Sequence, residues 1–69
     1  MSSYTVMPSG AEWFNYEHIG GDEQTIYSLN AHWFSSDTPI AIRNNDTRVT
    51  RIFTRKLDSN GKLLEVIEH

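Results

Sequence analysis

The chain has 69 residues, no cysteine and a formal net charge of −3, which is enough for one small domain. A domain of this size buries only about 60% of the surface of its unfolded chain, and without cysteine it has neither disulfides nor thiolate metal ligands. We therefore expect a single domain over residues 1–69 with a marginal core and no membrane-spanning segment. The missing disulfides favour a cytoplasmic setting, in the cell or in an infected host cell.

Residues 9–21, SGAEWFNYEHIGG, admit both a helix and a strand. A serine followed three residues later by a glutamate fits a capping box, and a glycine pair ends the segment, so a short helix near 10–19 is one alternative. The segment is rich in Trp, Phe, Asn, Tyr and His, however, which are weak helix formers. A strand would place Phe14 and Tyr16 on one face. We favour this strand, with a hairpin through the glycines into residues 24–34.

The alternation of apolar and polar residues predicts a strand over residues 27–34, YSLNAHWF. The apolar residues of its first seven positions share one parity, and the polar residues share the other. A helical alternative places Ile26, Leu29 and Trp33 on one stripe, but it also places Asn30 in the middle of the apolar arc. We therefore prefer the strand.

The segments together predict an all-β fold: a small antiparallel sheet or barrel of five to six short strands with a C-terminal β-hairpin. Residues 3–7 (SYTVM) and 39–43 (PIAIR) are β-favouring, and the hairpin strands are expected at about 48–57 and 62–68. Apolar residues lie on both faces of this hairpin, which favours a curved sheet or a contact with a partner. The alternative fold is α+β, with a short helix near 10–19.

Two turns compete at the tip of this hairpin, DSNGK. A two-residue type I′ turn would set Arg55 opposite Val66. A three-residue loop that ends in a left-handed glycine would set Arg55 opposite Glu65 and Phe53 opposite Ile67. Because the second register pairs opposite charges and apolar side chains, we expect the three-residue loop.

No arrangement of residues predicts catalysis, a metal site or a cofactor. The histidines, His18, His32 and His69, are too far apart in sequence for a short zinc motif. Nine carboxylates scattered over turns and short strands form no selective acid–base pair, and Gly20-Gly21 lacks the Lys-Ser/Thr of a phosphate loop. We therefore expect that the protein is not an enzyme and has no catalytic residue, bound metal or cofactor.

The N-terminal half is acidic and aromatic, because residues 1–36 hold four carboxylates and neither Lys nor Arg. Aromatic side chains are enriched at protein–protein interfaces, and acids steer a partner that carries a basic patch. We expect a non-catalytic protein-binding module, such as an accessory subunit or an inhibitor of a larger protein; a phage-type inhibitor and a homo-oligomer fit the same composition. The expected contact residues are Glu12, Trp13, Tyr16, Glu17, Asp22 and Glu23.

The alternative function is that of a nucleic-acid-binding β-domain. All six Lys and Arg residues lie within residues 37–69, and the run RVTRIFTRK interleaves basic and apolar side chains, as single-strand binding surfaces do. The acidic net charge makes this alternative the weaker one. The residues that would carry it are Arg43, Arg48, Arg51, Arg55 and Lys56.

Overall fold

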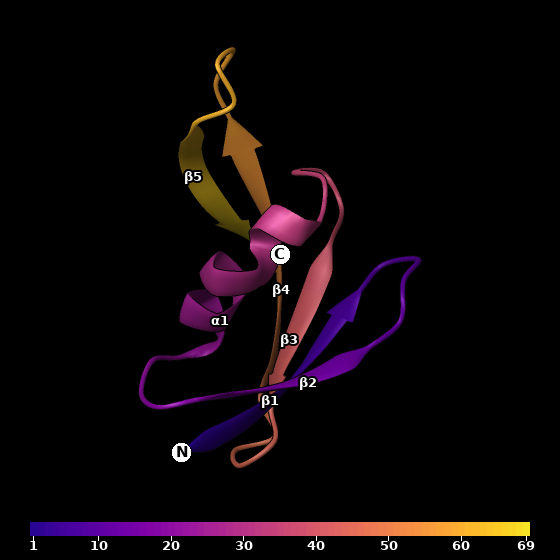
Figure 1. The fold of residues 1–69 in the computed structure, drawn as a ribbon, viewed down its shortest axis with the longest axis vertical. Coiled ribbons are helices and arrows are strands. Elements are labelled where there is room, and N and C mark those ends of the chain that lie inside the picture. The colour runs from indigo at the N-terminus through magenta and orange to yellow at the C-terminus, as the bar shows by residue number, and fades with distance from the viewer.

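The computed structural model describes all of residues 1–69 as a five-stranded antiparallel sheet with one short helix on one face (Figure 1). Across the sheet the strand order is β2-β1-β3-β4-β5, so β2 and β5 are the edges. The prediction of a small antiparallel β-rich domain with a C-terminal hairpin is therefore confirmed. The strands are β1 (Ser2–Pro8), β2 (Phe14–His18), β3 (Ile40–Asn44), β4 (Thr50–Leu57) and β5 (Leu63–Glu68), and the helices are α1 (Glu23–Asn30) and the 3₁₀ turn η1 (Ala31–Trp33).

The helix belongs to the connection that crosses the sheet. β1 is antiparallel to both β2 and β3, so β2 and β3 run in the same direction with β1 between them. The chain from β2 to β3 forms α1, which packs on β3, β4 and β1. In Figure 1, α1 lies in front of the sheet, and the tip of the β4–β5 hairpin extends beyond it. One face of the sheet is thus covered by the helix, and the other, which we call the open face, has no covering layer.

The core lies between α1 and the middle three strands. Each strand contributes alternate side chains to it, since successive residues of a strand point to opposite faces. The ring of Tyr27 stacks on the ring of Phe53 with the centroids 5.2 Å apart. Full burial of one such side chain contributes about 1.5–3 kcal/mol, so a small set of residues holds the domain together. The buried apolar residues are Tyr4, Val6, Ile26, Tyr27, Ala31, Ile40, Ile42 and Phe53.

The strand predicted over residues 27–34 is wrong, because this segment forms the end of α1 and then η1. Asp22 caps the helix by accepting a hydrogen bond from Thr25 N at 3.0 Å. Asn30, whose position argued against a helix, is buried, but its Nδ2 donates to Ile26 O at 2.9 Å. Because this amide is hydrogen-bonded, its burial carries little penalty, and the helix can bury Ile26 and Tyr27 on the same face.

The strand favoured within residues 9–21 forms as β2, and the alternative helix near 10–19 does not. Its predicted pairing with residues 24–34 is wrong, because β2 pairs with β1 and sets Tyr16 opposite Tyr4. The glycine pair leads into the helix cap instead. A Cβ at Gly21 would lie 2.9 Å from Thr25 Cγ2, and the residue has φ +78°, so this position favours glycine.

The C-terminal hairpin combines both predicted registers. At its tip, Asp58 N donates to Lys62 O at 2.8 Å and Gly61 has φ +83°, so the three-residue loop is confirmed. Beyond Leu57 and Leu63 an irregularity shifts the pairing by one residue. The predicted pairs of Arg55 with Glu65 and of Phe53 with Ile67 are therefore wrong.

The shifted register matches charges on both faces of the hairpin. Glu65 lies opposite Lys56 on the open face, and Glu68 lies opposite Phe53 on the helix-covered face. The Glu68 carboxylate lies 2.7 Å from the guanidinium of Arg51, which is two residues before Phe53 on β4. Opposite charges on neighbouring strands favour a register, and a bulge is the usual means of moving a strand by one residue.

We expect Phe53→Ala to destabilise the fold by about 3–5 kcal/mol, because the side chain is fully buried and its loss leaves a cavity beneath α1. A domain of this length has about 3–10 kcal/mol in total, so much of the protein should be unfolded at room temperature. Ile52→Ala, at the preceding position but on the open face, is the control and should lower the free energy of unfolding by about 1 kcal/mol. Urea titration followed by circular dichroism compares the two variants, and equal losses would contradict this account of the core.

Candidate functional site

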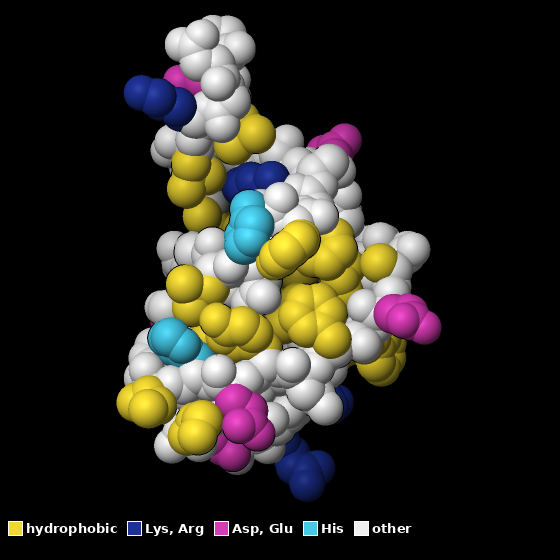
Figure 2. All heavy atoms as spheres, viewed as in Figure 1, with side chains coloured by type: hydrophobic (Ala, Val, Ile, Leu, Met, Phe, Trp, Pro, Cys, Tyr) yellow, Lys and Arg dark blue, Asp and Glu magenta, His cyan; other side chains and the backbone are white.

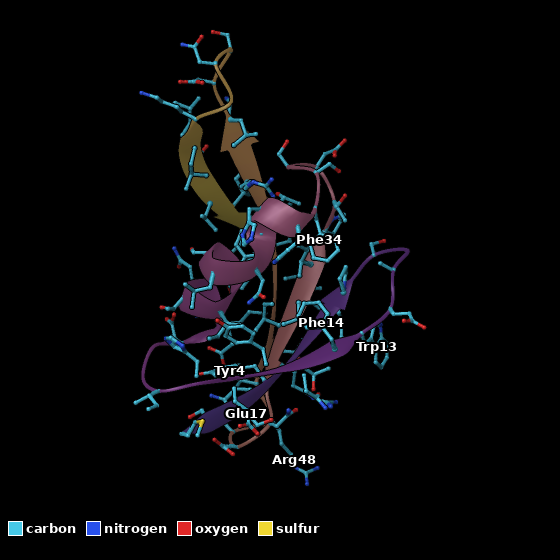
Figure 3. The ribbon with its side chains drawn as sticks, viewed as in Figure 1. Tyr4, Trp13, Phe14, Glu17, Phe34 and Arg48 are labelled. Carbon is cyan, nitrogen blue, oxygen red and sulfur yellow. The ribbon has the colours of Figure 1, made fainter.

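The residues predicted for protein contact do not share one surface. Glu12 and Trp13 lie in the β1–β2 loop, where Trp13 is 68% exposed. Tyr16 is half-buried and packs against the core. Glu17, the next residue, points to the open face of the sheet. Figure 3 shows Trp13 and Glu17 at well-separated places on β2 and its preceding loop.

The other two predicted contact residues, Asp22 and Glu23, both form salt bridges within the chain. The Arg51 guanidinium lies 2.7 Å from Glu68, 3.4 Å from Asp22 and 3.6 Å from Glu23. It also lies over the Phe53 ring, 5.2 Å from its centroid. This network, which we call the Arg51 clamp, joins the start of α1 to the end of β5.

Three residues of the Arg51 clamp, Asp22, Arg51 and Glu68, have shifted pKa values. The hydrogen bond from Arg51 holds the pKa of Glu68 below its ordinary value, and the positive charge of Arg51 adds to this effect. The pKa of Asp22 is lowered mainly by the hydrogen bond from Thr25 N, with a further contribution from Arg51. The pKa of Arg51 is raised, chiefly by its hydrogen bond to Glu68. Asp22, Arg51 and Glu68 are therefore charged at neutral pH, which suits a structural clamp.

The residues predicted for nucleic-acid binding are divided between the two faces of the sheet. Arg51 and Arg55 share the helix-covered face, whereas Arg43 and Lys56 point to the open face. Arg48 lies in the β3–β4 turn, with φ 65°, at the end of the sheet far from the hairpin tip (Figure 3). The structure brings two of the five together, since Arg43 and Arg48 line one groove of about 550 Å³.

The surface richest in exposed aliphatic side chains is the outer part of the β4–β5 hairpin, residues 55–67, which we call the hairpin arm. Leu63 is 55% exposed, Leu64 58% and Ile67 37%. Figure 2 shows hydrophobic side chains along this arm, below its polar tip. No strand lies on the outer side of β5, and an edge strand that exposes apolar side chains is a template for pairing with another chain.

The unpaired backbone groups of β5 follow from the register. His69 N donates to Ile52 O at 2.8 Å, so these residues form a hydrogen-bonded pair. Such pairs alternate with non-hydrogen-bonded pairs along an antiparallel ladder. Glu65 and Ile67 therefore direct their backbone groups at β4, and Val66 and Glu68 direct theirs outward. We call this outward side of residues 63–68 the β5 edge.

A pocket of about 270 Å³ lies between the hairpin arm and the end of the helix layer. Arg55 forms part of its wall, and its Nη2 donates to Phe34 O at 2.7 Å. Arg55 Nη1 is buried and has no hydrogen-bond acceptor, and the same is true of the hydroxyl of Tyr27. Tyr27 also lines the pocket and is 1% exposed. The apolar part of the lining comes from Tyr27, Ala31, Leu57, Leu63 and Val66.

Sequence reasoning missed this pocket because two of its lining residues were predicted in the wrong place. Tyr27 was expected on a strand, and Arg55 was expected to pair with Glu65. One signal was available, since Asp22 followed by Glu23 is a favourable start for a helix. A helix from that point places Tyr27 and Ala31 on one face. The isolated Arg55 had no such signal, because it depends on the register shift.

Comparison with protein-family models, with curated proteins and with solved structures returned no match to this chain. None of the helices has the length and apolar character needed to cross a membrane. No group of three His, Asp or Glu side chains lies close enough to hold a metal ion. The candidate site therefore rests on geometry alone, and it consists of the β5 edge and the pocket beside it.

We expect Arg51→Gln to reduce the loss of stability that the protein shows as the pH falls from 7 to 3. The pKa values of Asp22 and Glu68 are lower in the folded protein than in the unfolded chain, so their contribution is complete above about pH 5 and is lost as the pH falls below about 4. Without Arg51 the pKa of Glu68 returns towards its ordinary value, whereas Asp22 keeps its hydrogen bond from Thr25. The thermal midpoint measured between pH 7 and pH 3 should thus fall less steeply in the variant.

Arg43→Gln is the matched control, because Arg43 makes no salt bridge and its Nε donates to Asn45 Oδ1. Its profile should run parallel to that of the unmodified protein. If the thermal midpoint of Arg51→Gln also ran parallel to that of the unmodified protein, the pairing of Arg51 with Asp22 and Glu68 would contribute nothing to the pH dependence of stability.

Proposed function

We propose that this protein is a non-catalytic binding module that takes up an extended segment of another protein as a sixth strand along the β5 edge. The observation that carries the proposal is an edge strand with outward backbone groups at Val66 and Glu68 and exposed side chains at Leu63, Leu64 and Ile67. In strand addition, backbone hydrogen bonds supply affinity and alternate side chains supply specificity. An accessory subunit or an inhibitor of a larger protein would act in this way.

A segment of another protein suits this edge better than a second copy of the chain does. Two-fold antiparallel pairing centred on Glu65 or Glu68 would set that carboxylate opposite its own copy, which is unfavourable. Centring on Val66 would set Glu68 opposite Leu64, and centring on Ile67 would set Glu68 opposite Val66. In these two registers the Glu68 carboxylate would have to leave Arg51, which lies 2.7 Å away, before it could interact with the other copy. Self-pairing therefore either opposes like charges or breaks the Arg51 clamp, whereas a segment of another protein does neither.

The acidic residues outside the Arg51 clamp have a supporting role in the proposal. Glu12 and Glu17 are exposed and have no salt-bridge partner within the chain. They would steer a partner that carries a basic patch, an effect that falls with salt concentration. Nucleic-acid binding has weaker support, because its predicted residues lie on two faces and Arg51 is already paired with three carboxylates.

We expect a Leu64→Lys/Ile67→Lys double substitution to weaken partner binding at least tenfold, about 1.4 kcal/mol. It removes two exposed apolar side chains and adds charge to the edge, while the core is untouched. The measurement is capture by the immobilised chain from a lysate of its source organism. After a high-salt wash and nuclease treatment, the retained amount of one defined partner protein is compared between the variant and the unmodified chain. Circular dichroism checks that the variant folds.

Trp13→Lys/Ile19→Lys is the matched control, since it makes the same two apolar-to-lysine changes at exposed loop residues away from β5. It should retain the partner. If the loop variant lost the partner and the edge variant kept it, the contact surface would be the one expected from the sequence. Capture that disappears after nuclease treatment would favour the nucleic-acid alternative.

A further inference from the structure

We infer that the pocket beside the β5 edge receives a carboxylate carried by the docked segment, with Arg55 and Tyr27 as its hydrogen-bond donors. This inference rests on the proposed docking at β5. It extends that proposal by naming the chemistry of one partner side chain, which the edge alone does not specify.

Arg55 Nη1 and the Tyr27 hydroxyl are both buried without an acceptor. They are the only buried side-chain nitrogen or oxygen atoms of the chain that lack a partner, and both residues line the same pocket. Buried polar groups in folded proteins are nearly always hydrogen-bonded, and an unsatisfied one destabilises the fold. Two such donors at one pocket point to an acceptor that arrives from outside the chain.

The positive charge of Arg55 has no acidic partner within the chain. Although the chain has nine acids, Arg55 makes no salt bridge, whereas Arg51 has three. The register shift places Glu65 on the opposite face, beside Lys56. A partly buried guanidinium favours a negatively charged acceptor, and a carboxylate matches its planar geometry.

The side chains of a docked strand would point to the two faces of the sheet in turn. Alternate residues of an added strand would lie on the helix-covered face, where Val66 of β5 lines the pocket. A side chain opposite Val66 would thus point over the pocket. The aliphatic walls formed by Leu57 and Leu63 suit the methylene groups of such a side chain, with Arg55 and Tyr27 at its charged end.

The end of α1 opposes an anion only weakly. Helix carbonyl groups carry partial negative charge at this end. Two of them already accept hydrogen bonds, since Asn30 Nδ2 donates to Ile26 O and Ala31 N donates to Tyr27 O. The full charge of Arg55 therefore outweighs the remaining partial charges.

The test is an NMR titration of the full chain with capped tripeptides, followed by backbone amide shifts and the Arg55 Nε signal. The probes are acetyl-Val-Glu-Val-amide and its isosteric Gln counterpart. We expect the Glu peptide to bind at least about fivefold more tightly, with shifts at Val66 and Glu68 from the edge and at Arg55 from the pocket.

Two further probes identify the source of the carboxylate. Acetyl-Val-Gln-Val with a free C-terminus presents a chain-terminal carboxylate, and isovalerate presents a free small acid. Tighter binding of the Glu peptide than of the capped Gln peptide supports the inference, and tighter binding of the free C-terminus alone would overturn the assignment to a side chain. Isovalerate that binds as tightly as the Glu peptide would overturn it, because a docked segment would then be unnecessary.

Tyr27→Phe separates this role from a structural one. Removing the unpartnered hydroxyl should raise the thermal midpoint of the free protein, yet reduce the preference for Glu over Gln. Arg55→Gln should abolish that preference, and Arg43→Gln, on the open face, should leave it unchanged. A Tyr27→Phe variant with unchanged preference would overturn the role of the hydroxyl, as expected if only water occupies the pocket.

The outcomes distinguish this inference from the proposed function. Equal binding of the Glu and Gln peptides with shifts along the β5 edge would overturn the carboxylate inference and leave strand addition standing. Preference for Glu with shifts confined to the pocket would support carboxylate recognition and overturn strand addition. No shift with any probe up to about 10 mM would overturn the inference.

Discussion

The one-residue shift between β4 and β5 determines which face of the sheet each charged side chain of the hairpin occupies. Because side chains alternate along a strand, moving the pairing by one residue exchanges the two faces. The shift sets Glu65 beside Lys56 on the open face and brings Glu68 to Arg51 on the helix-covered face. Arg55 is left without an acid. A single irregularity thus produces both the clamp that ties β5 to α1 and the unpaired guanidinium at the pocket.

The small size of the domain explains why an apolar edge stays uncovered. α1 has eight residues and covers only the middle of a five-stranded sheet. The hairpin arm extends past it, so Leu63 and Leu64 stay more than half exposed. Domains of this length have little chain to spare for covering their edges. A strand from a partner would cover the same side chains and complete the hydrogen bonds of β5.

Tyr27 connects stability with the proposed function. Its ring belongs to the core and stacks on Phe53, whereas its hydroxyl lacks an acceptor. A phenylalanine would fill the same space without an unsatisfied donor. Local rules of folding tend to be broken at functional sites, and here the two violations, Tyr27 and Arg55, meet at one pocket.

The sequence by itself determined the features that depend on neighbouring residues. Composition indicated one β-rich domain without disulfides, residues 3–7 and 39–43 were recognisable as strands, and the pairing of residues across the hairpin favoured the three-residue loop. The tertiary structure decided the rest. Seven alternating residues fit either a strand or a short helix; Asp22 is a local capping signal for the helix, but the packing of Tyr27 on Phe53 selected α1. The register of β5, the isolation of Arg55 and the pocket all depend on contacts between distant segments, which local patterns do not encode.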